Sequence, residues 1–340
     1  MDIIFFDHPR FADDLFAVLE NSKDGKVKAL ISSSSIENIG KQLAICDKYD
    51  QFMLYTTCGI HPHNTKNINI DESIKEVEKI VTKENKVVAI GETGIDLERK
   101  FYPLEQQKNS FTAHIKLAFS VNKPLIFMAK QSHTEVINVL KLFDSEELLK
   151  IPKIITCFDG MVTEDEIQYY NSIGCYYCIC GLINDDCRNK PIITALKHIT
   201  LDKILTITYA PFYSPVPNYK SEPQYMQHIT QKIENELNIK KNTEFFFSQF
   251  KTLQELIESN WITIFPSIKL LSDEQMKVKI LNAPQTQNKI THPKTSEPNK
   301  ETAVYRPAFL NKNDNKKTQQ PTRLDLNDES QFPSLSSTKK

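Results

Sequence analysis

The sequence predicts a closed parallel α/β barrel of the TIM-type (β/α)8 class, followed by a polar tail. Eight short apolar runs alternate with longer segments of helical or loop character, which is the strand count of such a barrel. The runs lack strict apolar–polar alternation, as is typical of strands buried on both faces. The predicted strands are Ile3–Phe6, Val27–Ser33, Phe52–Cys58, Val87–Glu92, Pro124–Met128, Lys153–Phe158, Cys175–Cys180 and Lys203–Thr208.

Helical periodicity fills the longer intervals between these strands. In Leu104–Val121, the apolar residues Phe111 and Ile115 lie near one face, while most polar residues lie elsewhere. Ser132–Phe143 has the same character. Two more helices are predicted after the eighth strand, near Glu222–Leu237 and Phe245–Asn260.

Composition limits the classes of protein that fit. The chain has 340 residues, 40% of them hydrophobic, so a sizeable core is possible. The 42 basic and 43 acidic residues nearly cancel, so no global basic field indicates nucleic-acid binding, although a local basic groove stays possible. The apolar start Met1–Phe6 is too short for a signal peptide, and no run reaches the roughly 18 apolar residues of a membrane span. We expect an intracellular protein, cytoplasmic or nuclear, without a membrane segment.

The composition changes near residue 270, so we divide the chain into a barrel of residues 1–270 and a tail of residues 271–340. The tail is rich in Asn, Lys, Thr, Gln, Ser and Pro, and we expect it to be largely disordered. Two apolar islands interrupt it, at Val304–Leu310 and Gln331–Leu335. They are either short docking motifs for a protein partner or chance apolar residues. The side chains expected to bind a partner are Tyr305, Phe309, Phe332 and Leu335.

Seven cysteines occur along the chain, and Cys175 and Cys178 have the CxxC spacing. A zinc or redox site needs that spacing on a turn. Here the run around it is a predicted strand, in which neighbouring side chains point to alternating faces. We therefore favour buried free thiols over a metal site.

Two motifs at successive strand ends carry the candidate chemistry. Gly59–His63, with the sequence Gly-Ile-His-Pro-His, closes the third predicted strand, and Gly91–Asp96 closes the fourth. Imidazoles and a carboxylate at such positions are what a barrel hydrolase uses to hold divalent metals.

In order and spacing, these motifs resemble those of the TatD family of metal-dependent deoxyribonucleases, over roughly residues 1–265. The resemblance also rests on Glu105–Gln107, Pro124–Leu125, Cys157–Gly160, Ala210–Pro211 and Ser221–Pro223. It implies a barrel of the metal-dependent hydrolase type. It also implies metal ligands from an HxH pair, a Glu, two His and an Asp, holding ions that activate water for attack on a phosphodiester.

Only part of that ligand set is present in this sequence. The resemblance places Glu92 as the one retained metal ligand. Apolar side chains offer no lone pair to a metal, and neutral Thr and Tyr are weak ligands. We therefore expect a pseudoenzyme without a cofactor, which binds or scaffolds partners through its barrel and tail, with bulky Phe6 and Tyr209 filling the barrel mouth. The degenerate ligand positions are Ile4, Phe6, Ala129, Thr156 and Tyr209.

The retained polar residues allow a residual role. His61 and His63 resemble a family pair close to the substrate phosphate, and with Asp96 they are the candidate catalytic residues. The alternative, which we favour, is structural: hydrogen bonds from the imidazoles to backbone, and an Asx-type loop cap from Asp96. We expect Glu92 to pair with Lys130 rather than with a metal ion.

A second hypothesis is a working metal-dependent deoxyribonuclease or other phosphoesterase with a rearranged site. It would bind Mg, Mn or Zn and act on DNA, using His61, His63 and Glu92. Further candidates to complete such a site are His8, His133 and Asp159.

Overall fold

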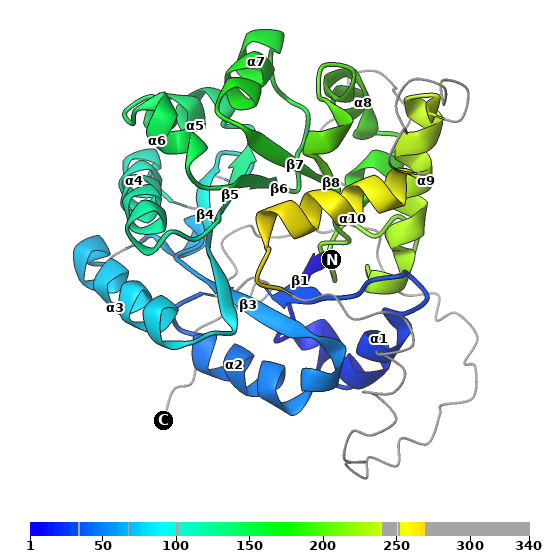
Figure 1. The fold of residues 1–340 in the computed structure, drawn as a ribbon, viewed down its shortest axis with the longest axis horizontal. Coiled ribbons are helices and arrows are strands. Elements are labelled where there is room, and N and C mark those ends of the chain that lie inside the picture. Colours follow the sequence, from blue (N-terminus) through cyan, green and yellow to red (C-terminus); the bar gives the residue numbers. More distant parts are fainter. Residues whose placement is uncertain (33–34, 67, 100–101, 240–249, 251, 269–340) are drawn as a thin grey trace, which may run out of the picture. The chain divides into compact units, whose positions relative to one another are not determined.

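The computed structural model describes residues 1–32, 35–66, 68–99, 102–239, 250 and 252–268. As predicted, this part of the chain forms a nearly closed (β/α)8 barrel (Figure 1). The eight strands pair in chain order, and every pair is parallel. The strands are β1 (Asp2–Ile4), β2 (Leu30–Ser32), β3 (Leu54–Cys58), β4 (Val87–Asp96), β5 (Leu125–Lys130), β6 (Lys153–Thr156), β7 (Cys175–Ile179) and β8 (Ile204–Thr206).

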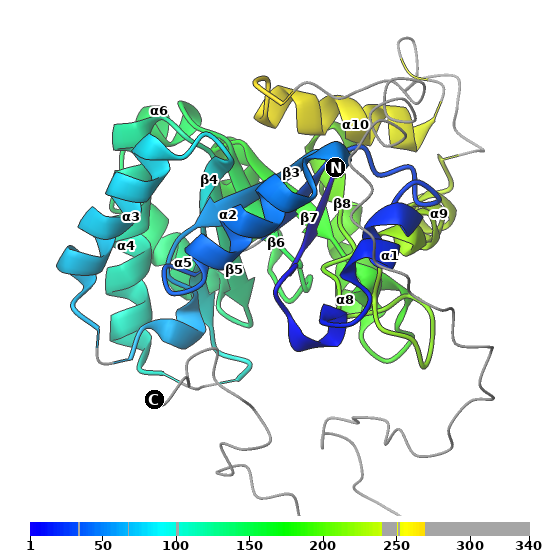
Figure 2. The same cartoon turned by 90° about the horizontal axis from the view of Figure 1, so that it is seen from below.

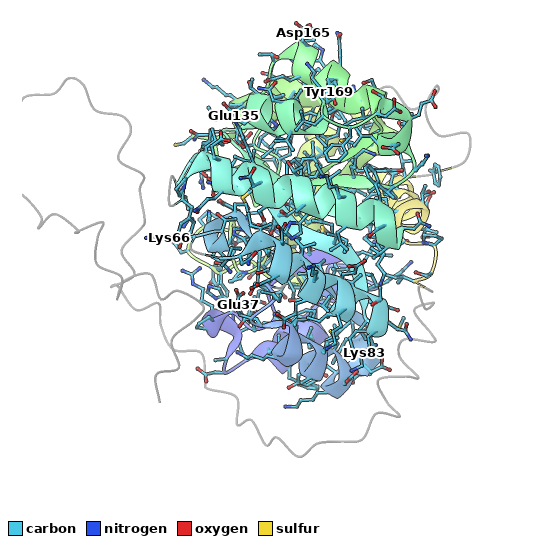
Figure 3. The ribbon with its side chains drawn as sticks, turned by 90° about the vertical axis from the view of Figure 1, so that its left-hand side faces the viewer. Glu37, Lys66, Lys83, Glu135, Asp165 and Tyr169 are labelled. Carbon is cyan, nitrogen blue, oxygen red and sulfur yellow. The ribbon has the colours of Figure 1, made fainter. Side chains whose placement is uncertain are left out.

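Helices surround the strands on the outside, and Figure 2 shows them from a second direction. Their outer faces carry charged side chains such as Lys83, Glu135 and Asp165 (Figure 3). The α-helices are α1 (Leu15–Asn21), α2 (Ile39–Lys48), α3 (Ile70–Lys83), α4 (Leu104–Val121), α5 (His133–Leu140), α6 (Ser145–Leu149), α7 (Glu164–Ser172), α8 (Asn189–Leu196), α9 (Met226–Glu236) and α10 (Leu253–Ile264).

The last two helices begin later than the sequence pattern predicts. A 3-10 turn over Pro223–Tyr225 precedes α9, since proline suits the first turn of a helix but not its interior. The expected start of the final helix lies partly outside the described residues. The Asn260 side chain donates hydrogen bonds to the carbonyl oxygens of Leu201 (3.0 Å) and Ile204 (2.9 Å). Helix α10 therefore packs at the start of β8, at the amino end of the barrel, away from the carboxyl ends of the strands.

Backbone and side-chain hydrogen bonds together close the barrel between β1 and the segment after β8. The backbone contributes the Ile4–Ala210 bridge and a bond from Phe5 N to Ala210 O of 2.9 Å. The buried carboxylate of Asp2 adds two contacts, accepting from Thr208 N at 2.6 Å and from Thr208 Oγ1 at 2.5 Å. Burial raises the pKa of Asp2 to about 6 despite these donors. The two hydrogen bonds to Asp2 take the place of part of the backbone pairing that β1 and β8 lack.

Strand β4 extends beyond its predicted end and carries the central site residue. Its last residues, Thr93–Asp96, pair with Phe127–Lys130 of β5 after a register shift. The shift includes Gly91, whose φ is +131°, and a Cβ there would lie 2.2 Å from the carbonyl oxygen of Ile126. Only glycine fits so close an approach at such a φ. Glu92 follows directly, inside the barrel wall.

The cysteines behave as the sequence predicts. All seven are free thiols, and all but the exposed Cys187 are buried. Cys175 and Cys178 both lie in β7 rather than on a turn. The expectation of small buried hydrophobes is thus confirmed. None of the described helices is long and apolar enough to span a bilayer.

The predicted tail motifs with Tyr305, Phe309, Phe332 and Leu335 lie outside the described residues.

We predict that Asp2→Ala lowers the free energy of unfolding by about 2–3 kcal/mol, because it leaves the buried donors of Thr208 without an acceptor. Chemical denaturation measures the change. The matched control is Asp13→Ala on the exposed surface, for which we expect a change within about 0.5 kcal/mol. Equal effects of the two variants would contradict the role of Asp2 in closing the barrel.

Candidate functional site

A buried carboxylate lies at the carboxyl end of the barrel. The Glu92 side chain is only 1% exposed. The hydroxyl of Tyr209 donates to both of its oxygens, at 3.0 Å and 2.9 Å, and the Thr156 hydroxyl donates to Oε1. Burial, reinforced by the charge of Glu92, raises the pKa of Tyr209 well above its usual range. The phenol therefore keeps its proton and acts as a donor, as a buried carboxylate requires.

Aromatic rings cover this carboxylate. The Phe5 ring meets Tyr209 edge to face, with centroids 4.9 Å apart, and Tyr213 stacks on Tyr209 at 6.1 Å. The expectation that Phe6 fills the mouth is corrected here, because Phe6 packs instead into an apolar cluster beside α1. Adjacent side chains of an extended segment point to opposite sides. The mouth is thus filled by Phe5 and Tyr209.

The positions that match family ligands divide into two groups. Ile4, Phe6 and Ala129 are buried and apolar, so they have no lone pair for a metal ion. Thr156 and Tyr209 instead direct their hydroxyl protons at Glu92. Across the described residues, no group of three or more His, Cys, Asp or Glu side chains is arranged to hold a metal ion.

The two histidines of the Gly59–His63 motif form a connected unit with Asp96. His63 Nε2 lies 2.6 Å from Asp96 Oδ2, and His61 Nδ1 accepts from His63 N at 3.1 Å. The two imidazole rings are 4.4 Å apart. Burial, reinforced by the neighbouring His63, lowers the pKa of His61 well below its usual range. For Asp96, burial alone would raise the pKa, but the contact with His63 outweighs it and lowers the pKa.

Hydrogen bonds to the backbone hold this unit in place. Asp96 Oδ1 accepts from Arg99 N at 3.1 Å, as expected for a loop cap, and Asp96 N donates to the Gln107 side chain at 2.8 Å. The Gln107 amide also donates to Tyr102 O at 3.0 Å. The cluster is thus anchored from the start of α4. The His63 side chain stays partly exposed to solvent.

The Lys130 ammonium has two partners that the sequence did not indicate. It donates to the carbonyl oxygen of Cys157 and lies 5.4 Å from the centroid of the Tyr213 ring. Its pairing with Glu92 stays a prediction.

The remaining candidates for a rebuilt site have other partners. His133 Nε2 lies 3.0 Å from Asp159 Oδ1, and its Nδ1 lies 3.2 Å from the Tyr170 hydroxyl. Burial alone would raise the pKa of Asp159, but His133 and Lys130 outweigh it and lower the pKa to about 2. His8 Nδ1 accepts from Arg10 N at 3.1 Å and thereby caps a turn. These contacts indicate structural roles.

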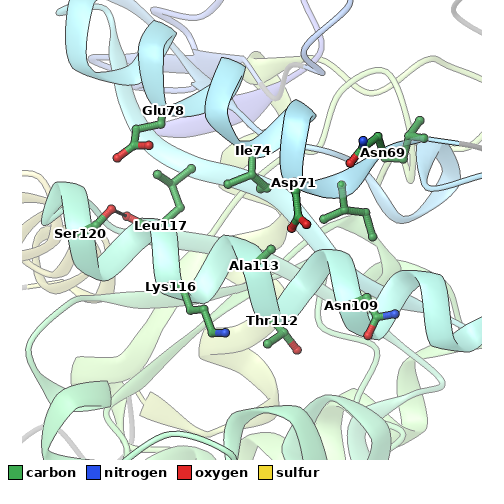
Figure 4. A pocket seen from close by; sticks show the side chains of 12 residues that line it. Asn69, Asp71, Ile74, Glu78, Asn109, Thr112, Ala113, Lys116, Leu117 and Ser120 are labelled. Atoms are coloured by element: carbon green, nitrogen blue, oxygen red, sulfur yellow. Dashed lines mark hydrogen bonds between the residues drawn. The ribbon is translucent and has the colours of Figure 1, made fainter.

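A separate groove of about 720 Å³ lies on the outer surface between α3 and α4 (Figure 4). Its lining mixes apolar side chains such as Ile74 and Leu117 with the charged Asp71, Glu78 and Lys116. None of the site residues described above lines it. We therefore place the candidate site at the carboxyl end of the barrel, not in this groove.

The parallel barrel carries polar residues where its strands end, which is where TIM-barrel enzymes have their active sites. Residues 5–266 match the family model described as TatD related DNase. The chain belongs to this family, as its motifs predict.

Comparison with individual proteins agrees with this assignment. A protein of Edwardsiella piscicida described as 3'-5' ssDNA/RNA exonuclease TatD is 29% identical over 231 residues, covering 66% of this chain and 85% of that protein. The protein of the same description from Escherichia coli K12 is 28% identical over 240 residues, with the same coverage.

Solved structures show the same fold. A TatD homologue from Escherichia coli K12 has a TM-score of 0.64 at 20% identity, covering 78% of this chain and 98% of that one. A TatD family hydrolase from Entamoeba histolytica has a TM-score of 0.61 at 20% identity, covering 78% and 97% of the two chains.

We predict that Tyr209→Phe lowers the free energy of unfolding by about 2–3 kcal/mol, because it removes a donor to both oxygens of a buried carboxylate. Tyr169→Phe is the matched control. The Tyr169 hydroxyl makes no hydrogen bond within the described part of the chain, so a change within about 0.5 kcal/mol is expected. Denaturant titration compares the two variants, and a neutral Tyr209→Phe would argue against the hydroxyl cap.

Proposed function

We propose that this chain is a TatD-family barrel that works by binding partners rather than by metal-dependent hydrolysis. The observation that carries the proposal is the state of Glu92. Its two carboxylate oxygens accept hydrogen bonds from Tyr209 and Thr156, which stand at two positions where the family resemblance implies metal ligands. A carboxylate satisfied in this way needs no cation to be stable when buried.

Proteins of this family typically bind divalent metal ions, and the donor set of this chain does not fit a two-ion site. Divalent ions need several carboxylate or imidazole ligands around them. Ile4 and Ala129 contribute none, and Phe5 and Tyr209 occupy the space at the strand ends. We therefore assign no catalytic step to a metal ion.

The partner is proposed to be a protein that binds the tail. The support comes from the sequence, in which Tyr305 and Phe309 in one island, and Phe332 and Leu335 in the other, stand among polar residues. Aromatic and leucine side chains beside proline suit short docking motifs. The barrel would then serve as the folded body that carries them.

A second candidate function is hydrolysis of phosphodiesters at a rearranged site. The observation that favours it is the unit of His61, His63 and Asp96, which is ordered by hydrogen bonds and partly open to solvent. The names of the bacterial relatives make single-stranded DNA the substrate to test.

The first test measures metal content and cleavage on the same full-length protein. We expect no stoichiometric Mn, Zn or Mg after purification. We also expect no metal-dependent cleavage of labelled single-stranded DNA above the level of Glu92→Gln, because the carboxylate is already saturated by hydroxyls. Added Mn²⁺ or Zn²⁺ should leave the melting temperature unchanged, since only ligands that bind the native state raise it. Elemental analysis, a gel assay and thermal unfolding provide the three readouts.

The control variant for this test is Glu135→Gln, which makes the same substitution on the outer helix α5. Bound metal together with cleavage that Glu92→Gln abolishes and Glu135→Gln retains would refute the binding proposal. The rearranged hydrolase would then be the function to pursue.

The second test concerns the tail. Proximity labelling in cells should give a set of neighbouring proteins that disappears when Tyr305, Phe309, Phe332 and Leu335 are all replaced by Ala. Replacing four polar residues of the same tail, Asn311, Asn313, Gln319 and Gln320, provides the control. The binding energy of such motifs is concentrated in a few apolar anchors, so only the first set should matter. Identical labelling by both variants would reject the docking motifs.

A further inference from the structure

Two buried thiols meet where β6 and β7 end. The sulfur atoms of Cys157 and Cys180 are 2.8 Å apart, and both side chains are fully buried. Within the described part of the chain, this is the one pair of cysteine sulfurs in contact. Neither residue takes part in the hydrogen bonds that hold Glu92.

The backbone is arranged to bring these sulfurs together. Cys157 has a φ of +46°, in the left-handed region that residues other than glycine seldom adopt. Its carbonyl oxygen accepts a hydrogen bond from the Lys130 ammonium. The backbone N–H of the next residue, Phe158, donates to Cys178 O at 2.9 Å. An unfavourable conformation persists only where its surroundings impose it. These contacts hold the Cys157 side chain against Cys180.

Charge around the pair favours a thiolate on one of the two sulfurs. Burial by itself disfavours the thiolate of Cys180. The thiol of Cys157, the Lys130 ammonium and the Leu182 amide together outweigh burial and lower the pKa of Cys180. A thiolate, not a thiol, is the nucleophile in cysteine oxidation. The Lys130 ammonium, which donates to the Cys157 carbonyl oxygen, lies beside the pair.

The chain segment after β8 packs beside the pair. Gly181, the residue after Cys180, lies directly on it, since a Cβ there would lie 1.7 Å from Tyr213 O. Tyr213 is half-buried, and the exposed Arg188 lies 5.6 Å from the centroid of its ring.

We propose that Cys157 and Cys180 form a dithiol–disulfide couple that a hydroperoxide such as hydrogen peroxide oxidises in the folded protein. One of the two sulfurs attacks a peroxide oxygen as its thiolate, and the O–O bond breaks to give a sulfenic acid and hydroxide, which takes up the proton that this thiol released. The other thiol then gives up its proton, and its thiolate attacks the sulfenic sulfur. The S–S bond forms, and the leaving hydroxide takes up that proton to become water. Two thiols and one peroxide thus give one disulfide and two waters, whether or not the barrel also binds metal.

The test counts thiols in the full-length protein. Reduced protein is exposed to hydrogen peroxide, quenched with catalase, unfolded and alkylated, and its mass is measured. We expect two of the seven thiols to escape alkylation and to return after treatment with a thiol reductant. A protease that cleaves after Asp and Glu cuts between the two cysteines, for example at Asp159 and Glu164. The disulfide should therefore join two separate fragments.

Variants assign the pair. Cys157→Ser and Cys180→Ser should each abolish the protection, with Cys157→Ala and Cys180→Ala as replacements if a buried serine prevents folding. The control variant is Cys178→Ser. Cys178 lies in β7 and is also fully buried, so this variant should still protect two thiols. Protection that survives in Cys180→Ser would overturn the assignment.

A refolding experiment tests whether the two sulfurs can form a disulfide when the folded shell does not limit the access of an oxidant. Unfolded protein is refolded in a buffer of reduced and oxidised glutathione, so that the disulfide can form without passage through the folded shell. Seven alkylated thiols in both arms would overturn the proposal. A disulfide that forms only on refolding would overturn it too, because the folded protein would then not react with peroxide.

Discussion

The buried carboxylate of Glu92 needs hydrogen-bond donors, and much of the candidate site is arranged around the groups that provide them. Glu92 on β4 accepts hydrogen bonds from Thr156 at the end of β6 and from Tyr209 after β8. Hydroxyls provide donors without adding a second charge that must lose its hydration, so neutral groups offset the cost of burial. The carboxylate thereby links β4 to the ends of β6 and β8.

The aromatic cover and the neighbouring thiols depend on the same arrangement. Tyr209 is held by its hydroxyl, so its ring offers fixed faces to Phe5 and Tyr213. The Lys130 ammonium holds the Cys157 carbonyl and faces Tyr213. The chain thus places neutral side chains where the family resemblance implies metal ligands, and two thiols follow the strands beside them.

Two further buried carboxylates also receive hydrogen-bond donors, one where the barrel closes and one in the histidine unit. Asp2 and Asp96 are buried carboxylates with donors from the backbone or from histidine. Their pKa values differ in direction, because burial dominates at Asp2 while His63 dominates at Asp96. Asp2 therefore stabilises the closure of the barrel, whereas Asp96 belongs to a partly exposed cluster of polar side chains.

The sequence by itself determined the barrel, the buried cysteines, the strand that carries Glu92 and the strand that precedes His61–His63, because local apolar patterns and short motifs are encoded by neighbouring residues. Only the tertiary structure decided that Phe5 rather than Phe6 covers Tyr209, that Lys130 binds the Cys157 carbonyl, and that Cys157 meets Cys180. These outcomes depend on side-chain direction at strand ends and on contacts between distant segments. A register shift of one residue there moves a side chain to the opposite face of the strand. The apolar pattern within one segment does not show such a shift.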